Sequence, residues 1–107
     1  MTAAAAHLEL LIVPGCPHEL DAAAAFQHAL LAAGLSDATF DIVLIDSPQQ
    51  AEERGFAGSP SFHLDGHDIL PDAGAPNALA CRLYRSASGT LTGVPDSETL
   101  AAAILRT

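Results

Sequence analysis

The chain has 107 residues, of which 50% are hydrophobic and only 16% are charged. This length and composition predict one globular domain over residues 1–107, with a core spanning about 7–106. Thirteen acidic residues stand against four arginines and no lysine, so the net charge is −9. A field of that sign disfavours nucleic acid and anionic lipid as partners.

The N-terminal segment carries no targeting signal. Its first six residues are not basic, and the apolar run from Leu8 to Val13 is short and interrupted by Glu9. A signal peptide or a membrane span needs a longer apolar run. We therefore expect a cytoplasmic protein that does not enter a membrane.

The first third of the chain has the pattern of a β-α-β unit. The run His7–Val13 ends in four consecutive apolar residues before Pro14-Gly15, which is typical of a central strand. An alanine-rich helix is predicted from Pro17 to about Ala33, because proline suits a first helical turn and a glycine follows. The β-branched run Thr39–Ile45 predicts a second strand. The helix between them is long enough to make the two strands parallel.

The next segment predicts a short helix and a hairpin. Asp46-Ser47 caps the helix, which ends near Gly55. Pro60–Leu64 forms a third strand, Asp65-Gly66 supplies a hairpin turn, and His67–Leu70 is the return strand.

The C-terminal third is less regular. Pro71 to about Ala80 is rich in proline, glycine, aspartate and asparagine and predicts a loop. Alternation of polar and apolar residues predicts a short extended segment that spans Cys81–Arg85. A terminal helix is predicted for Ser97–Arg106. The predicted order is therefore β-α-β-α-β-β-α.

Two cysteines are the main candidates for chemistry. Cys16 lies at the junction of the first strand and the first helix, where unpaired backbone N–H groups and the helix dipole favour thiolate over thiol. Cys81 follows the predicted loop. The absence of an export signal argues against a structural disulfide framework. Each cysteine is a candidate for reactivity or metal binding. The alternative is that each is simply a small hydrophobic residue buried in the core.

Four short elements accompany this element order: Gly15-Cys16-Pro17, Gly58-Ser59-Pro60, Asp65-Gly66 and Cys81-Arg82-Leu83-Tyr84. In this combination the chain resembles the thioredoxin-like superfamily, and within it a group of small proteins, some of which are labelled by similarity to alkylmercury lyase. The resemblance covers Leu8 to Leu105. It implies an α/β fold with a four-stranded mixed sheet in the order 2-1-3-4 and helices on both faces.

The resemblance also assigns a site. It places the nucleophilic cysteine at Cys16 and a cis proline at Pro60, beside the sulfur. Pro60 is then expected to shape a groove, and Ser59 to present backbone groups to an extended thiol partner. Pro17 and His18 complete the expected substrate-binding residues.

The chain departs from dithiol oxidoreductases at one position. Glu19 stands one helical turn after Cys16, where those proteins place a second, resolving cysteine. Its carboxylate opposes ionisation of the thiol, whereas a protonated His18 favours it. Three chemistries remain open: a monothiol that exchanges mixed disulfides, a dithiol with Cys81 as a distant resolving partner, and a soft-metal site supported by His18 or Glu19.

The topology favours an approach of Cys81 to Cys16. If the third strand runs antiparallel to the first, Pro60 begins at the sheet edge where Cys16 lies, and the return strand brings the chain back to that edge. We therefore expect catalytic roles for Cys16 and Cys81, joined by a disulfide on oxidation. His63 and His67 flank the hairpin at the opposite end, so we expect both to face solvent.

The sequence thus predicts a thioredoxin-like thiol-disulfide redox protein without a resident cofactor or metal. Its expected partner is a thiol- or disulfide-bearing protein or a small thiol. The alternative is a non-enzymatic thioredoxin-like module that binds a protein partner or a soft metal such as mercury or zinc; the alkylmercury-lyase label is only a weak pointer to mercury, because labels follow fold.

Overall fold

The computed structural model describes residues 7–35, 37–70, 83–85 and 88–106. Within them the elements form a four-stranded mixed sheet in the order β2-β1-β3-β4 and a separate pair β5-β6. The predicted α/β class and strand order are therefore confirmed. The elements follow one another as β1 (Leu8–Ile12), α1 (Glu19–Ala32), β2 (Phe40–Leu44), α2 (Pro48–Arg54), β3 (Ser61–Leu64), β4 (His67–Asp68), β5 (Tyr84–Arg85), β6 (Leu91–Thr92) and α3 (Ser97–Arg106).

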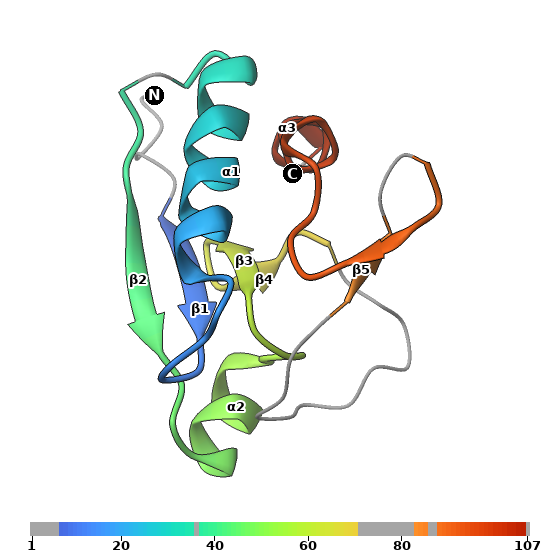
Figure 1. The fold of residues 1–107 in the computed structure, drawn as a ribbon. Helices are drawn as coiled ribbons and strands as arrows, with labels where there is room; N and C mark the ends of the chain where they lie inside the picture. Colours follow the sequence, from blue (N-terminus) through green and yellow to red (C-terminus); the bar gives the residue numbers. More distant parts are fainter. Residues whose placement is uncertain (1–6, 36, 71–82, 86–87, 107) are drawn as a thin grey trace.

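The central strand of the sheet is β1, with β2 parallel on one side and β3 antiparallel on the other. Figure 1 shows α1 standing against the sheet between β2 and α3, while α2 lies at the end where β1 and β2 finish. The helix α1 runs back along the sheet, which is what a parallel β1–β2 pair requires. The first three elements are therefore the predicted β-α-β unit.

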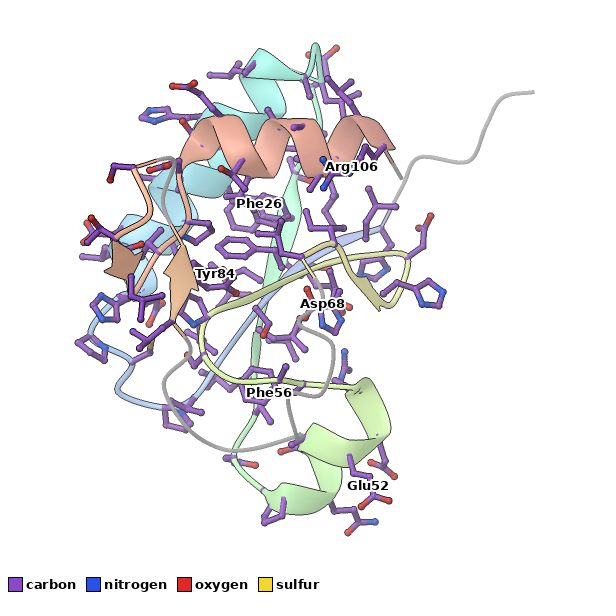
Figure 2. The ribbon with its side chains drawn as sticks, turned by 90° about the vertical axis from the view of Figure 1, so that its right-hand side faces the viewer. Phe26, Glu52, Phe56, Asp68, Tyr84 and Arg106 are labelled. Atoms are coloured by element: carbon purple, nitrogen blue, oxygen red, sulfur yellow. The ribbon has the colours of Figure 1, made fainter. Side chains whose placement is uncertain are left out.

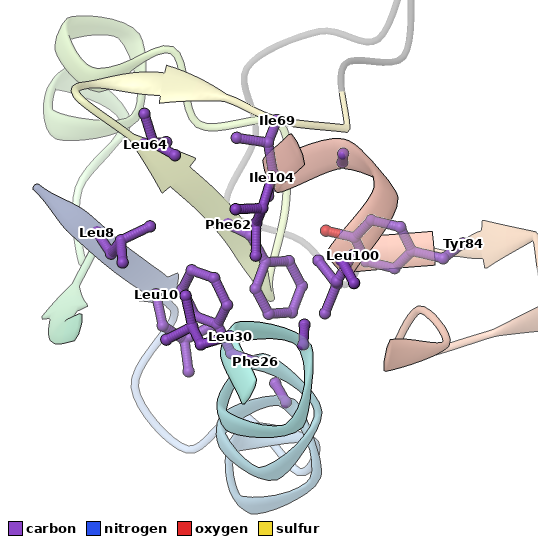
Figure 3. Packing of buried hydrophobic residues seen from close by; sticks show 14 of the residues in the cluster. Leu8, Leu10, Phe26, Leu30, Phe62, Leu64, Ile69, Tyr84, Leu100 and Ile104 are labelled. Carbon is purple, nitrogen blue, oxygen red and sulfur yellow. The ribbon is translucent and has the colours of Figure 1, made fainter. Parts of the chain in front are cut away.

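Alternation along β1 divides its side chains between two cores. Leu8, Leu10 and Ile12 contribute to the larger cluster with α1 and α3, whereas Leu11 packs on the other face with residues in and around α2. Phe62 of β3 joins the larger cluster, its ring edge-on to that of Phe26 with centroids 5.1 Å apart (Figure 3). Helices thus cover both faces of the sheet.

The predicted local signals for caps and turns are confirmed. The Ser47 hydroxyl accepts the backbone N–H of Gln50 at 3.2 Å, and Gly55 ends α2 in the left-handed conformation. Asp65 and Gly66 both have positive φ, 53° and 84°, as a tight hairpin turn between β3 and β4 requires.

Three elements depart most from the predictions. α1 begins at Glu19, two residues after the predicted start at Pro17, with His18 as the N-cap. The return strand β4 has only two residues. The strand β6 was not predicted, because only its pairing with β5 makes this two-residue segment a strand. The predicted loop over Pro71–Ala80 lies outside the described residues.

The expectation that His63 faces solvent is wrong. His67 is exposed, but the side chain of His63 is buried, with 2% of its surface accessible. The reason is its position in β3, which has β1 on one side and β4 on the other. All four residues of this internal strand are buried.

Across the described residues, no helix is both long and apolar enough to cross a membrane.

Candidate thiol site at Cys16

A tight turn places Cys16 at the end of β1. The N–H of Cys16 donates to the carbonyl of Val13 at 3.1 Å, and Gly15 has a φ of +75°. Pro14 followed by a glycine with positive φ is typical of a type II turn. The turn reverses the chain directly after the strand, so Cys16 lies in the approach to α1 and not within its first turn.

The hydroxyl of Ser59 accepts a backbone N–H just beyond the last residue pair of β1 and β3. Leu11 pairs with Ser61, and continuing this antiparallel register by two residues brings Val13 opposite Ser59. The Val13 N–H does not meet a backbone carbonyl there. It donates instead to Ser59 Oγ at 3.1 Å.

The same hydroxyl donates to the cysteine. Ser59 Oγ lies 3.0 Å from Cys16 Sγ. Since the oxygen already accepts the Val13 N–H, and a hydroxyl has one proton, that proton points to the sulfur. Ser59 is fully buried and Cys16 is 7% exposed, so little water competes for this contact. A buried donor aimed at sulfur is suited to a thiolate that attacks a disulfide or leaves one.

The peptide bond between Ser59 and Pro60 is cis, as the family resemblance predicted. The carbonyl of Pro60 accepts the hydroxyl of Tyr84 from β5. The Tyr84 ring lies edge-on to Phe62, with centroids 6.1 Å apart. Figure 2 shows Tyr84 reaching inward from the hairpin toward the aromatic core. Tyr84 thereby fixes the segment that carries Ser59.

The β5-β6 hairpin also approaches the start of α1. A Cβ atom placed on Gly93 would lie 2.6 Å from Cε1 and 2.7 Å from Cδ2 of the His18 ring. A side chain at Gly93 would therefore require the His18 ring to move. The hairpin, the N-cap residue and the cysteine turn therefore form one packed region.

The structure brings together three of the predicted site residues: Cys16, Ser59 and Pro60. Pro17 is exposed beside the cysteine, and His18 is partly buried as the N-cap. Cys81 lies outside the described residues, so its approach to Cys16 stays a prediction; Cys16 itself is a free thiol.

Sequence reasoning missed two contributors to the site. Tyr84 was noted only as part of a family element, and Gly93 was not noted at all. The available signal for Tyr84 was that the single tyrosine of the chain lies within a predicted extended segment. Gly93 gave no signal, because its role depends on a ring far away in the sequence. In the described ranges, no three histidine, cysteine, aspartate or glutamate side chains gather as metal ligands would.

These observations define an α/β domain with a buried cysteine just after its first strand and a serine hydroxyl, next to a cis proline, that donates to the cysteine sulfur. Compared with models of protein families, with curated proteins and with solved structures, the chain matches none.

Proposed function

We propose that this is a thioredoxin-like domain that carries out thiol-disulfide exchange at Cys16. The observation that carries the proposal is the hydroxyl of Ser59, which donates to Cys16 Sγ. The element order and the strand order support the family assignment. The partner is a thiol- or disulfide-bearing protein or a small thiol.

The proposed step is a thiol-disulfide exchange among three sulfur atoms. The Cys16 thiolate attacks one sulfur of a disulfide, a bond forms between Cys16 Sγ and that sulfur, and the other sulfur leaves as a thiolate. The Ser59 proton stabilises negative charge on Cys16 Sγ before attack, and again when a second thiol releases it. No other redox agent is required, because the incoming disulfide is the oxidant.

Access to the sulfur restricts the partner. Cys16 keeps 7% of its surface exposed, and its neighbours Pro14, Gly15 and Pro17 are all exposed. A disulfide therefore reaches the sulfur past this turn. We expect the disulfide of a small molecule or an extended peptide to react faster than a disulfide buried in a folded protein.

The experiment uses the reduced full chain with glutathione disulfide, followed by mass spectrometry of the peptides. We expect a mixed disulfide on Cys16 in the wild type and in Cys81→Ser, and none at this position in Cys16→Ser. If Cys81 is a distant resolving partner, the wild type proceeds to an intramolecular disulfide, whereas Cys81→Ser accumulates the mixed disulfide. A Cys16 that stays unmodified while Cys81 reacts would overturn the proposal and favour the non-enzymatic binding module.

A further inference from the structure

The outer edge of β2 presents unpaired backbone groups. The N–H of Ile45 donates to the carbonyl of Ile12 at 2.8 Å, so Ile45 points its backbone groups toward β1. Backbone groups alternate along a strand, and those of Phe40, Ile42 and Leu44 therefore point away from β1. Among the described residues no strand pairs with this side.

The side chains of the same three residues are apolar and lie on the α1 side of the sheet. They pair in register with Leu8, Leu10 and Ile12 of β1, which fill the larger core. Phe40 is partly buried against Phe26, but Ile42 is 47% and Leu44 is 54% exposed. Soluble proteins protect such edges with lysine, proline or bulges. Residues 40–44 contain neither lysine nor proline, and their one charge, Asp41, lies on the other face.

We propose that this edge pairs with the β2 strand of a second copy of the chain, antiparallel and with the two-fold axis at Ile42. In this register Ile42 faces its own counterpart, and Phe40 faces Leu44 at both ends. All three residues have outward backbone groups, so each facing pair can exchange both of its hydrogen bonds. The two sheets then form one continuous sheet through an isologous contact.

The charges along β2 fit this register. Asp41 faces Val43 of the second copy, so the two Asp41 carboxylates do not lie opposite each other. Two carboxylates directly opposite each other would destabilise the pair. The Asp41 carboxylate lies 3.4 Å from His7 Nε2 of its own chain. If the register of the two β2 strands shifted by one residue, residues with outward backbone groups would face residues whose groups point to β1. If it shifted by two residues, one of the three hydrogen-bonded pairs would be lost. In this register a second copy can therefore pair with the β2 edge without placing like charges opposite each other.

Two exposed leucines of α1 extend the apolar surface. Leu20 and Leu31 are 83% and 51% exposed, and eleven residues of helix place them on one stripe. The buried residues Phe26 and Leu30 mark the sheet-facing side of α1. Figure 1 shows α1 between β2 and α3. In the paired form the two α1 helices flank the seam.

The dimer is expected to be weak. A five-residue strand spans only about 17 Å, so the contact is smaller than a standard interface. Each copy also carries a net charge of −9, and this mutual repulsion is screened by salt. Association is therefore expected at high protein concentration, and more strongly at high ionic strength.

The first measurement is sedimentation of the full chain over a range of concentrations. We expect Ile42→Lys to raise the dissociation constant by about tenfold or more, because two introduced lysines face each other. Leu105→Lys is the matched control: Leu105 is 68% exposed on α3 and gains the same charge. Both variants lower the charge repulsion between two copies equally. If only Ile42→Lys weakens the association, the contact therefore lies at the β2 edge. Mixing Ile42→Lys with Ile42→Glu should restore a heterodimer.

The second measurement is amide hydrogen exchange by NMR, which also reports whether each variant is folded. We expect the amides of Phe40, Ile42 and Leu44 to gain protection as concentration rises, whereas those of Asp41 and Val43 are protected throughout. Equal effects of Ile42→Lys and Leu105→Lys, or a monomer at about 1 mM in high salt, would overturn the proposal. If the chain stays monomeric under these conditions, the remaining interpretation is that the β2 edge pairs with an extended segment of another protein. The readouts do not involve Cys16, so they are independent of the thiol chemistry.

Discussion

At the scale of single residues, Ser59 links the sheet to the sulfur through one oxygen atom. Its hydroxyl accepts the N–H of Val13, the residue after β1, and donates to Cys16 Sγ. Tyr84 fixes the following residue by donating to the Pro60 carbonyl. The sulfur therefore depends on Ser59, and two segments that are distant in sequence hold Ser59 and its neighbour Pro60 through the Val13 N–H and the Tyr84 hydroxyl.

We predict that Ser59→Ala slows the alkylation of Cys16 by iodoacetamide at neutral pH by about tenfold, because a hydrogen bond to a charged group contributes about 1.5–3 kcal/mol. The matched control is Ser61→Ala, which removes another buried hydroxyl that does not touch the sulfur. Both variants should lose about 1–2 kcal/mol of unfolding free energy in urea. An unchanged alkylation rate in Ser59→Ala would show that the hydroxyl has no effect on the thiol.

Tyr84→Phe is expected to lower the free energy of unfolding by about 1–2 kcal/mol, because the Pro60 carbonyl loses its donor while the ring contacts with Phe62 remain. Tyr84→Leu removes the aromatic contacts as well and should cost about 2–4 kcal/mol. Urea unfolding measures both, with Ser88→Ala as an exposed-hydroxyl control. Equal losses in the two Tyr84 variants would mean that the ring contributes nothing beyond the hydroxyl.

At the scale of elements, the β5-β6 hairpin is the part that distinguishes this domain from a plain β-α-β-α-β-β-α order. It lies between β4 and α3 along the chain and packs against the aromatic core through Tyr84. Gly93, just after β6, meets the ring of the residue that caps α1. The hairpin thereby couples the C-terminal part of the chain to the entrance of the cysteine turn.

Gly93→Ala should destabilise the fold by about 1–3 kcal/mol, since the new methyl group overlaps the His18 ring. In a His18→Ala background the same change should cost much less, and the double-mutant cycle in urea measures the difference. Gly89→Ala is the control. Its φ of +88° makes any side chain strained, but nothing lies near its Cβ, so its cost should not depend on His18. Additive effects of Gly93→Ala and His18→Ala would contradict the contact.

At the scale of the whole molecule, the dominant feature is excess negative charge. Thirteen acidic residues are balanced by only four arginines, and one of these, Arg54, is paired with Glu9 at 3.2 Å. Like charges repel more strongly in a compact chain than in an unfolded one. Folding therefore works against electrostatic repulsion that salt can screen.

We predict that raising NaCl from about 0.02 M to 0.5 M increases the melting temperature by about 4 °C, which corresponds to about 1 kcal/mol for a domain of this size. Screening also weakens the exposed Arg54–Glu9 pair, but such pairs contribute little. The double variant Glu52→Gln/Glu53→Gln, which removes two exposed charges of α2, should show a smaller increase. A melting temperature that falls with salt would mean that attractive pairs outweigh the net repulsion.

The sequence by itself determined most of the elements. Apolar runs located β1, β2 and β3, and caps and turn residues located α2, α3 and the Asp65-Gly66 hairpin. These signals are local, because caps, turns and periodicity act over a few neighbouring residues. The predictions of a reactive Cys16 and of a cis bond at Pro60 came from short motifs of the same range, read through the family resemblance.

Only the tertiary structure decided how the site is built. Burial of His63 depends on β3 having a strand on each side, and the hydroxyl of Ser59 finds Val13 and Cys16 only because the β1-β3 register places it opposite them. Tyr84 and Gly93 act on residues more than twenty positions away. Such contacts follow from strand pairing and packing between distant segments, which leave no periodic pattern in the residues themselves.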